Sequence, residues 1–182
     1  REVRERLRAA GLPGGDISVG DTPGCVAATD WQGVDEVRAG NFVFFDLMQR
    51  ELGICADREI ACAVACPVVG VYPEAGRAVI HGGAVHLAKE RLAGPGGGDR
   101  YGELRSLEEG GFGGSVPGLA LTSLSQEHGI LTPTGRDGAG LVAALRPGDL
   151  VLVTPVHSCL TCEQHGSYRT VAGERLDRFR RA

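Results

Sequence analysis

The stretch Val151-Leu-Val-Thr-Pro-Val-His157-Ser-Cys159-Leu-Thr-Cys162 combines a structural pattern with a chemical one. The apolar run over residues 150–153 predicts a buried strand, and the Pro-Gly turn before it marks where the strand begins. If this strand continues past Pro155, the side chains of His157 and Cys159 point to the same face. The stretch therefore predicts a core strand that carries two ligand-type side chains at its end.

The pair of His157 and Cys159 is open to several interpretations. An imidazole and a thiolate side by side supply half of a tetrahedral zinc site, and the other positions would be left to water or a substrate oxygen. Cys159 and Cys162 also have C-x-x-C spacing, although the strand-then-helix context of thioredoxin is not evident. A Cys/His nucleophile pair rarely has i, i+2 spacing. In the remaining interpretation the two residues have only a structural role, as a packed thiol beside a hydrogen-bonded histidine.

Composition excludes some classes of partner. The chain has 182 residues, a net charge of −4 and 42% hydrophobic residues, which suits one domain or one and a part. The sequence lacks a basic cluster of the kind that binds nucleic acid, and its apolar runs are shorter than the ~20 residues of a membrane helix. Six cysteines without a secretory signal indicate reduced thiols in a cytoplasmic protein. We therefore expect neither a nucleic-acid nor a membrane partner.

The N-terminal part has the rhythm of a parallel α/β sheet. Residues 1–12 predict an amphipathic helix that ends at Gly11-Leu-Pro-Gly-Gly15. Short strands are predicted at residues 16–20 and within residues 35–45, and this alternation is typical of a parallel sheet or barrel. Because the sequence begins inside a helix, we expect the chain to be the C-terminal piece of a longer protein.

Two loops in this part are candidates for phosphate binding, because ligands bind where loops follow parallel strands. Thr22 offers a hydroxyl group, and Gly40-Asn41 offers backbone N–H groups without a crowding side chain. Together they could hold a phosphate group. Turns rich in Gly, Asn and Thr often serve only as turns, so both interpretations stay open.

From about Asp46 the pattern changes to strands without intervening helices. Strands are predicted at residues 61–72, 77–80, 119–124, 150–153 and 168–171. The glycine-rich residues 94–118 predict a long surface loop. Consecutive strands indicate an antiparallel β domain. The predicted organisation is therefore the end of an α/β barrel over residues 1–46, followed by an antiparallel β domain over residues 47–182.

Six motifs occur in the order in which they are found in one known family. They are Gly20-Asp-Thr-Pro23, Glu36-Val-Arg-Ala-Gly-Asn-Phe-Val-Phe-Phe-Asp46, Cys66-Pro-Val-Val-Gly70, Val79-Ile-His-Gly-Gly83, Ser125-Gln-Glu-His-Gly129 and Pro155-Val-His-Ser-Cys159. This set resembles the D-serine dehydratase and D-threonine aldolase family, from about residue 16 to residue 173. The resemblance implies an alanine-racemase-like architecture, in which a (β/α)8 barrel that carries pyridoxal 5'-phosphate (PLP) precedes an antiparallel β domain.

The resemblance also implies a site and a reaction. The zinc ligands of the family fall on His157 and Cys159, and the loops that hold the PLP phosphate fall on Thr22, Gly40 and Asn41. Because the aldolase branch tends to carry Asp where this chain has Cys159, the dehydratase branch is favoured. The implied reaction removes water and ammonia from D-serine, or a related 3-hydroxy-D-amino acid, to give pyruvate and ammonia. Retro-aldol cleavage of D-threonine and a non-catalytic zinc-binding remnant are the alternatives, and the family pairs as homodimers.

Two departures from the family bear on activity. The Schiff-base lysine of the family lies upstream of this chain, and Lys89, the only lysine, matches no catalytic motif. Phe42 stands where the family often has Tyr. The chain alone is therefore expected to be inactive. His128 and His81 are secondary candidates for orienting the substrate or the metal ligands, and Cys162 is expected near the metal without binding it.

Overall fold

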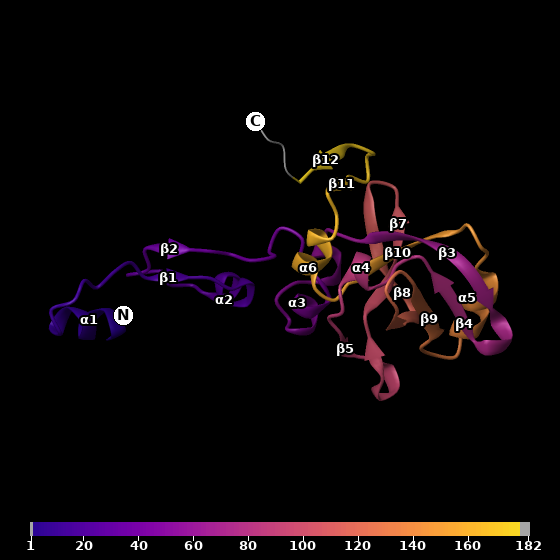
Figure 1. Cartoon of the computed structure of the whole chain (residues 1–182), viewed down its shortest axis with the longest axis horizontal. Helices are drawn as coiled ribbons and strands as arrows, with labels where there is room; N and C mark the ends of the chain where they lie inside the picture. The colour runs from indigo at the N-terminus through magenta and orange to yellow at the C-terminus, as the bar shows by residue number, and fades with distance from the viewer. Residues whose placement is uncertain (1, 179–182) are drawn as a thin grey trace. The chain divides into compact units, whose positions relative to one another are not determined.

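The computed structural model describes residues 2–178 and divides into two compact units, Arg1–Val43 and Phe44–Ala182 (Figure 1). Across residues 2–178, none of the helices combines the length and the apolar character that crossing a bilayer requires.

The first unit alternates helices and strands. It contains α1 (Glu2–Ala9), β1 (Ser18–Val19), α2 (Thr22–Ala27) and β2 (Glu36–Val37). β1 and β2 pair in parallel, as the alternation predicts. α1 is shorter than the predicted helix over residues 1–12, because Gly11 adopts a left-handed conformation (φ 75°) that ends it. Among residues 2–43, only Thr22 and Asn41 are buried, so this unit has little core of its own.

The second unit is built on a closed six-stranded barrel with strand order β10-β3-β4-β9-β8-β7 (Figure 1). Its strands are β3 (Val64–Tyr72), β4 (Arg77–Ile80), β7 (Gly102–Glu108), β8 (Gly111–Leu124), β9 (Gly129–Pro133) and β10 (Leu150–Pro155). All six pairings are antiparallel, which confirms the predicted antiparallel β domain. Closure leaves no unpaired edge in this sheet.

Short elements surround the barrel. They are α3 (Leu47–Glu51), η1 (Asp57–Glu59), η2 (Pro73–Ala75), α4 (Ala84–Leu87), β5 (Leu92–Ala93), η3 (Pro95–Gly97), β6 (Asp99–Arg100), α5 (Gly138–Ala144), α6 (Ser158–Glu163), β11 (Ser167–Arg169) and β12 (Arg175–Asp177). The strand predicted at residues 168–171 does not belong to the main sheet. Instead, β11 pairs only with β12, in a separate hairpin.

Two apolar clusters form the core of this unit. The larger one fills the barrel, where Val68, Ile80, Leu121 and other alternate residues of the strands are at most 5% exposed. The smaller one joins α3 to the chain just after β10, and its members are Leu47, Cys55, Ile60 and Val156. α3, α4 and α6 gather at this end of the barrel (Figure 1). The smaller cluster therefore holds α3 against the segment that leads into His157.

The prediction of a long loop over the glycine-rich residues 94–118 was wrong. This stretch contributes most of β7 and β8. Glycine is needed here because the strands pack closely: a Cβ atom at Gly102 would lie 2.6 Å from the Val153 side chain and 3.0 Å from the Thr154 carbonyl oxygen. Gly110, with φ 91°, makes the turn between the two strands. Gly102 therefore marks close packing between strands, and Gly110 marks a tight turn.

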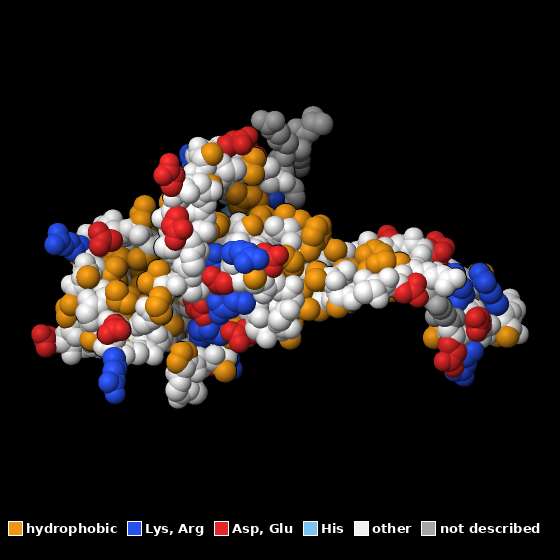
Figure 2. Space-filling model, turned by 180° about the vertical axis from the view of Figure 1, so that it is seen from behind, with side chains coloured by type: hydrophobic (Ala, Val, Ile, Leu, Met, Phe, Trp, Pro, Cys, Tyr) orange, Lys and Arg blue, Asp and Glu red, His pale blue; other side chains and the backbone are white. Residues whose placement is uncertain are grey.

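A network of ion pairs connects α3 and η1 to the barrel. The Arg50 guanidinium donates to both carboxylate oxygens of Glu103, each at 2.8 Å, and to Asp57 at 2.9 Å. Arg100 also pairs with Glu103. On the face of the second unit drawn in Figure 2, basic and acidic side chains are interspersed. Positive and negative groups therefore offset one another within the network.

This network predicts sensitivity to acid. Burial raises the pKa of Glu103, but the hydrogen bond from Arg50, the charges of Arg50 and Arg100, and Ser115 together hold it below its ordinary value. A carboxylate with a lowered pKa contributes its full stability above its unfolded-state pKa of ~4.3 and loses that contribution as the pH falls further. We expect the free energy of unfolding, measured with urea between pH 5 and pH 3, to fall more steeply in the wild type than in Glu103→Gln. Equal slopes would contradict this assignment.

Candidate functional site

His157 and Cys159 do not lie on one strand, as the sequence had predicted. β10 ends at Pro155, and His157 is the N-cap residue of α6, with φ −131° and ψ 109°. Cys159 is the second residue of that helix and is exposed. The strand ends here because the Asp46 carboxylate accepts a hydrogen bond from the Ser158 N–H at 2.8 Å, which fixes the first turn of the helix. The two side chains therefore stand at the start of a helix.

Asp46 is the functional contact that the sequence analysis missed. Its side chain is fully buried, and its Oδ2 atom lies 3.2 Å from His157 Nδ1. Its Oδ1 atom accepts the Gln49 N–H at 2.9 Å and so caps α3. A sequence signal existed, because an Asp directly before an apolar helical turn is a typical N-cap. Its approach to His157, across 111 residues, had no local signal.

The pair of Asp46 and His157 has a defined electrostatic state. Burial raises the pKa of Asp46, but the hydrogen bond with His157 and the N–H groups of Ser158 and Gln49 lower it below its ordinary value. An ionised carboxylate only accepts hydrogen bonds, so Nδ1 of His157 carries the proton and donates it. The hydrogen bond to Asp46 also raises the pKa of His157, against the effect of burial. In the neutral ring, Nε2 keeps its lone pair.

The donor set of His157 and Cys159 suits zinc, since imidazole nitrogen and thiolate sulfur are its usual ligands. Burial, Asp46 and Cys162 raise the pKa of the Cys159 thiol, and a bound cation would overcome this by favouring the thiolate. Within residues 2–178, no three His, Cys, Asp or Glu side chains are grouped so that they could hold a metal ion. The pair can therefore supply two ligands of an open site, and water, substrate or groups beyond these residues would complete it.

Cys162 contacts a different thiol from the one its spacing predicts. The C-x-x-C segment does lie where a strand leads into a helix, contrary to the expectation from the sequence. However, Cys162 interacts with Cys62, whose hydrogen bond lowers the pKa of Cys162 to about 7. The hydrogen bond with Cys162 and burial raise the pKa of Cys62. Every cysteine in the structure is a free thiol.

The proposed phosphate residues come together within the first unit. A Cβ atom on Gly40 would lie 2.8 Å from Thr22 Oγ1 and 3.9 Å from the Thr22 backbone nitrogen, so the missing side chain leaves space beside the Thr22 hydroxyl. Thr22 and the neighbouring Asn41 are 4% and 5% exposed. A hydroxyl, an amide side chain and backbone N–H groups suit a phosphate group. Lys89, the only lysine of the chain, is in the second unit and is exposed.

The two secondary histidines belong to a cluster of their own. The ring of His81 lies 4.8 Å from that of His86 and 5.7 Å from that of His128, between centroids. His165 lies 6.5 Å from His86 and donates to its carbonyl oxygen at 3.0 Å. Burial and the neighbouring histidines lower the pKa of His86. His157 faces Asp46 and Glu90 instead, so the structure does not bring His81 or His128 to it.

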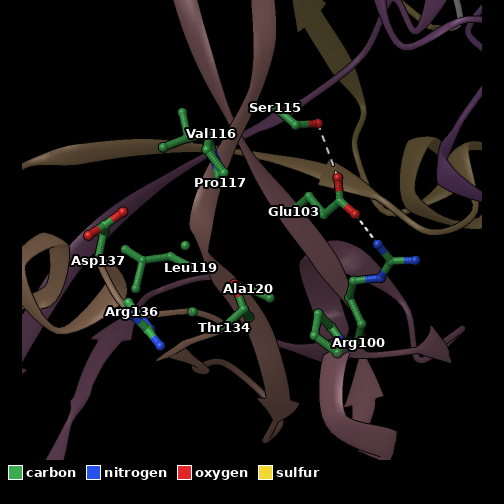
Figure 3. Close-up of a pocket in the computed structure, with 13 residues that line it drawn as sticks. Arg100, Glu103, Ser115, Val116, Pro117, Leu119, Ala120, Thr134, Arg136 and Asp137 are labelled. Atoms are coloured by element: carbon green, nitrogen blue, oxygen red, sulfur yellow. Dashed lines mark hydrogen bonds and ion pairs between the residues drawn. The ribbon is translucent and has the colours of Figure 1, made fainter.

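A cleft of about 460 Å³ lies in the second unit, between β8 and the turn at residues 134–137 (Figure 3). Two of its charged side chains, Arg100 and Glu103, pair with each other, and Ser115 donates a hydrogen bond to Glu103. Neither histidine nor cysteine lines it. The ligand-type chemistry of this unit is therefore found at His157 and not in this cleft.

Comparisons with known proteins identify the family of the chain. The family model described as "Putative serine dehydratase domain" matches residues 61–171. A D-threo-3-hydroxyaspartate dehydratase from Delftia sp. is 37% identical over 95% of this chain, and a D-serine dehydratase from Dictyostelium discoideum is 26% identical over 92%. These alignments cover 45% and 42% of the two relatives, so the chain spans less than half of their length.

Solved structures are similar over nearly the whole chain. The Delftia enzyme matches with a TM-score of 0.76 at 34% identity, over 95% of this chain and 46% of that one. An alanine-racemase-like protein from Idiomarina loihiensis matches with a TM-score of 0.78 at 27% identity, over 95% and 45%. Two mutants of a D-threo-3-hydroxyaspartate dehydratase also match, one with a histidine and one with a cysteine changed to alanine. The two positions are two residues apart, and the cysteine mutant is in the metal-free form. The family model covers more than half of the residues of this chain, and the chain therefore belongs to the serine dehydratase domain family.

Proposed function

We propose that the complete protein containing this chain is a PLP- and zinc-dependent lyase. It would eliminate water from D-serine, or from a related 3-hydroxy-D-amino acid; hydrolysis of the product, which takes up one water, would then give pyruvate or the corresponding 2-oxo acid and ammonia. The observation that supports this most directly is the start of α6, where His157 is held by Asp46 next to Cys159. The activity is proposed for the complete protein, because the chain spans less than half of its relatives.

The substrate class follows from what the named relatives share. One is a dehydratase of D-threo-3-hydroxyaspartate and another of D-serine, and both substrates carry an amino group at Cα and a hydroxyl group at Cβ. The metal-free cysteine mutant of a D-threo-3-hydroxyaspartate dehydratase, and the two-residue spacing between its mutated position and that of the histidine mutant, support a metal at His157 and Cys159 of this chain. The spacing of the two mutated residues is the same as that of this pair.

When bound, PLP supplies an electron sink for the bond broken at Cα, and zinc supplies a Lewis acid for the departing hydroxyl group. His157 and Cys159 would hold the zinc, and Asp46 keeps the proton on Nδ1 of His157. Thr22, Gly40 and Asn41 would hold the phosphate of PLP. We assign residues 1–46 to the end of the PLP-binding barrel and residues 47–182 to the β domain with the zinc site. Pairing into homodimers is part of the same proposal.

An assay of products tests the function. The complete protein, supplied with PLP and Zn²⁺, is incubated with D-serine and separately with D-threonine. We expect ammonia and pyruvate from D-serine, measured with coupled dehydrogenases. Release of glycine and acetaldehyde from D-threonine, without dehydration of D-serine, would assign the protein to the aldolase alternative. Zinc binding with neither product would indicate a non-catalytic remnant.

A further inference from the structure

We propose that Asp46 is a positioning residue of the metal site: its buried carboxylate holds the His157 imidazole with the proton on Nδ1, and thereby selects Nε2 as the metal-binding nitrogen. The inference rests on the proposed function, because it takes His157 as a zinc ligand. It adds a residue that lies outside the His-x-Cys motif and that contacts the metal only through His157.

The first argument is geometric. One carboxylate organises three groups: the N–H of Gln49 at 2.9 Å, the N–H of Ser158 at 2.8 Å and Nδ1 of His157 at 3.2 Å. The first belongs to α3, and the other two belong to the start of α6. The orientation of the imidazole is therefore tied to two helices at once.

The second argument is rigidity. Leu47 and Val156, the chain neighbours of Asp46 and His157, are at most 1% exposed and belong to the same apolar cluster. The Met48 N–H also donates to the Val156 carbonyl oxygen at 3.1 Å. The two sides of the contact between Asp46 and His157 are therefore held by packing and by a backbone hydrogen bond. A site supported in this way keeps its ligand oriented before the cation arrives.

The third argument is chemical. A neutral imidazole has one N–H and one lone pair, and a metal can bind only the nitrogen with the lone pair. Asparagine at position 46 would lose this control. If its oxygen faces Ser158 and His157, its NH₂ group faces the Gln49 N–H; if it is flipped, the NH₂ group faces Nδ1 and favours a proton on Nε2. Loss of such a partner typically weakens metal affinity by roughly 10–100-fold.

The test measures zinc affinity directly, independently of turnover. The full 182-residue chain competes for Zn²⁺ with a chromophoric chelator, as wild type, Asp46→Asn, His157→Ala and the double variant. A matched control is Asp149→Asn, because the Asp149 carboxylate also accepts a backbone N–H, that of Arg146 at 2.8 Å, but in an exposed turn. We expect a roughly 10–100-fold weaker affinity for Asp46→Asn and no change for Asp149→Asn. In the double variant, affinity should be no weaker than in His157→Ala.

The outcomes separate the inference from the proposed function. If wild type and folded Asp46→Asn bind zinc equally, the inference is overturned while the zinc site stands; a lower thermal midpoint with unchanged affinity would show that Asp46 serves only the fold. If the wild type binds no zinc, the zinc part of the proposed function falls as well. The ¹⁵N NMR signals of wild-type His157 give a test without any variant, when they are recorded for the metal-free chain at a pH at which the imidazole is neutral: a proton on Nδ1 supports the inference, and a proton on Nε2 overturns it.

Discussion

His157→Ala is expected to lower dehydratase turnover of the complete enzyme by about 100-fold or more, and to lower its zinc content to background. The reason is that the variant removes one of the two proposed zinc ligands at the start of α6, and a Lewis acid at a departing oxygen is worth several kcal/mol. Turnover is measured as ammonia release at saturating Zn²⁺, and metal content by elemental analysis. PLP absorbance should be retained, because Thr22, Gly40 and Asn41 are unchanged.

A matched control lies just after the same helix. His165 follows the C-terminal end of α6, and its Nε2 donates to the His86 carbonyl oxygen at 3.0 Å. His165→Ala removes the same side chain type without affecting the proposed ligands, so zinc content and turnover should stay close to wild type. Zinc retained at full stoichiometry in His157→Ala would show that the metal, if any, is bound elsewhere.

Asp57→Ala is expected to lower the free energy of unfolding of the β domain by about 3–5 kcal/mol, because it leaves a buried charge without its counter-ion. The Arg105 side chain is 0% exposed, and its ionic partner is Asp57 Oδ1 at 3.1 Å. Its other hydrogen bonds go to neutral oxygens, such as Thr154 Oγ1 at 2.9 Å and the Gly113 carbonyl at 3.2 Å. The loss is measured by urea unfolding near neutral pH.

Two further variants isolate the buried charge as the cause. Asp99→Ala breaks the exposed pair with Arg91, at 2.8 Å, and should cost less than about 1 kcal/mol. Arg105→Met in the Asp57→Ala background removes the buried charge that has lost its counter-ion, and it should recover part of the lost stability. Equal destabilisation by Asp57→Ala and Asp99→Ala would mean that burial of Arg105 does not matter.

Local patterns predicted the antiparallel β domain well, because its strands and turns depend on neighbouring residues. β4 spans the predicted residues 77–80. The turn before it ends at Gly76, which has the left-handed conformation (φ 58°) that glycine favours. The apolar run before Pro155 forms β10. The same reasoning wrongly predicted a long loop over the glycine-rich residues 94–118. Contacts with other strands, which the local pattern does not contain, decide whether glycine marks a loop or close packing.

The candidate site divides in a similar way. The sequence by itself determined which side chains could bind zinc and phosphate, since His157, Cys159, Thr22, Gly40 and Asn41 were named from residue type, spacing and family resemblance. It did not determine that His157 caps a helix or that Cys162 contacts Cys62. Only the tertiary structure brought Asp46 to His157, because a hydrogen bond across 111 residues depends on how α3 and α6 pack and leaves no periodic pattern along the chain.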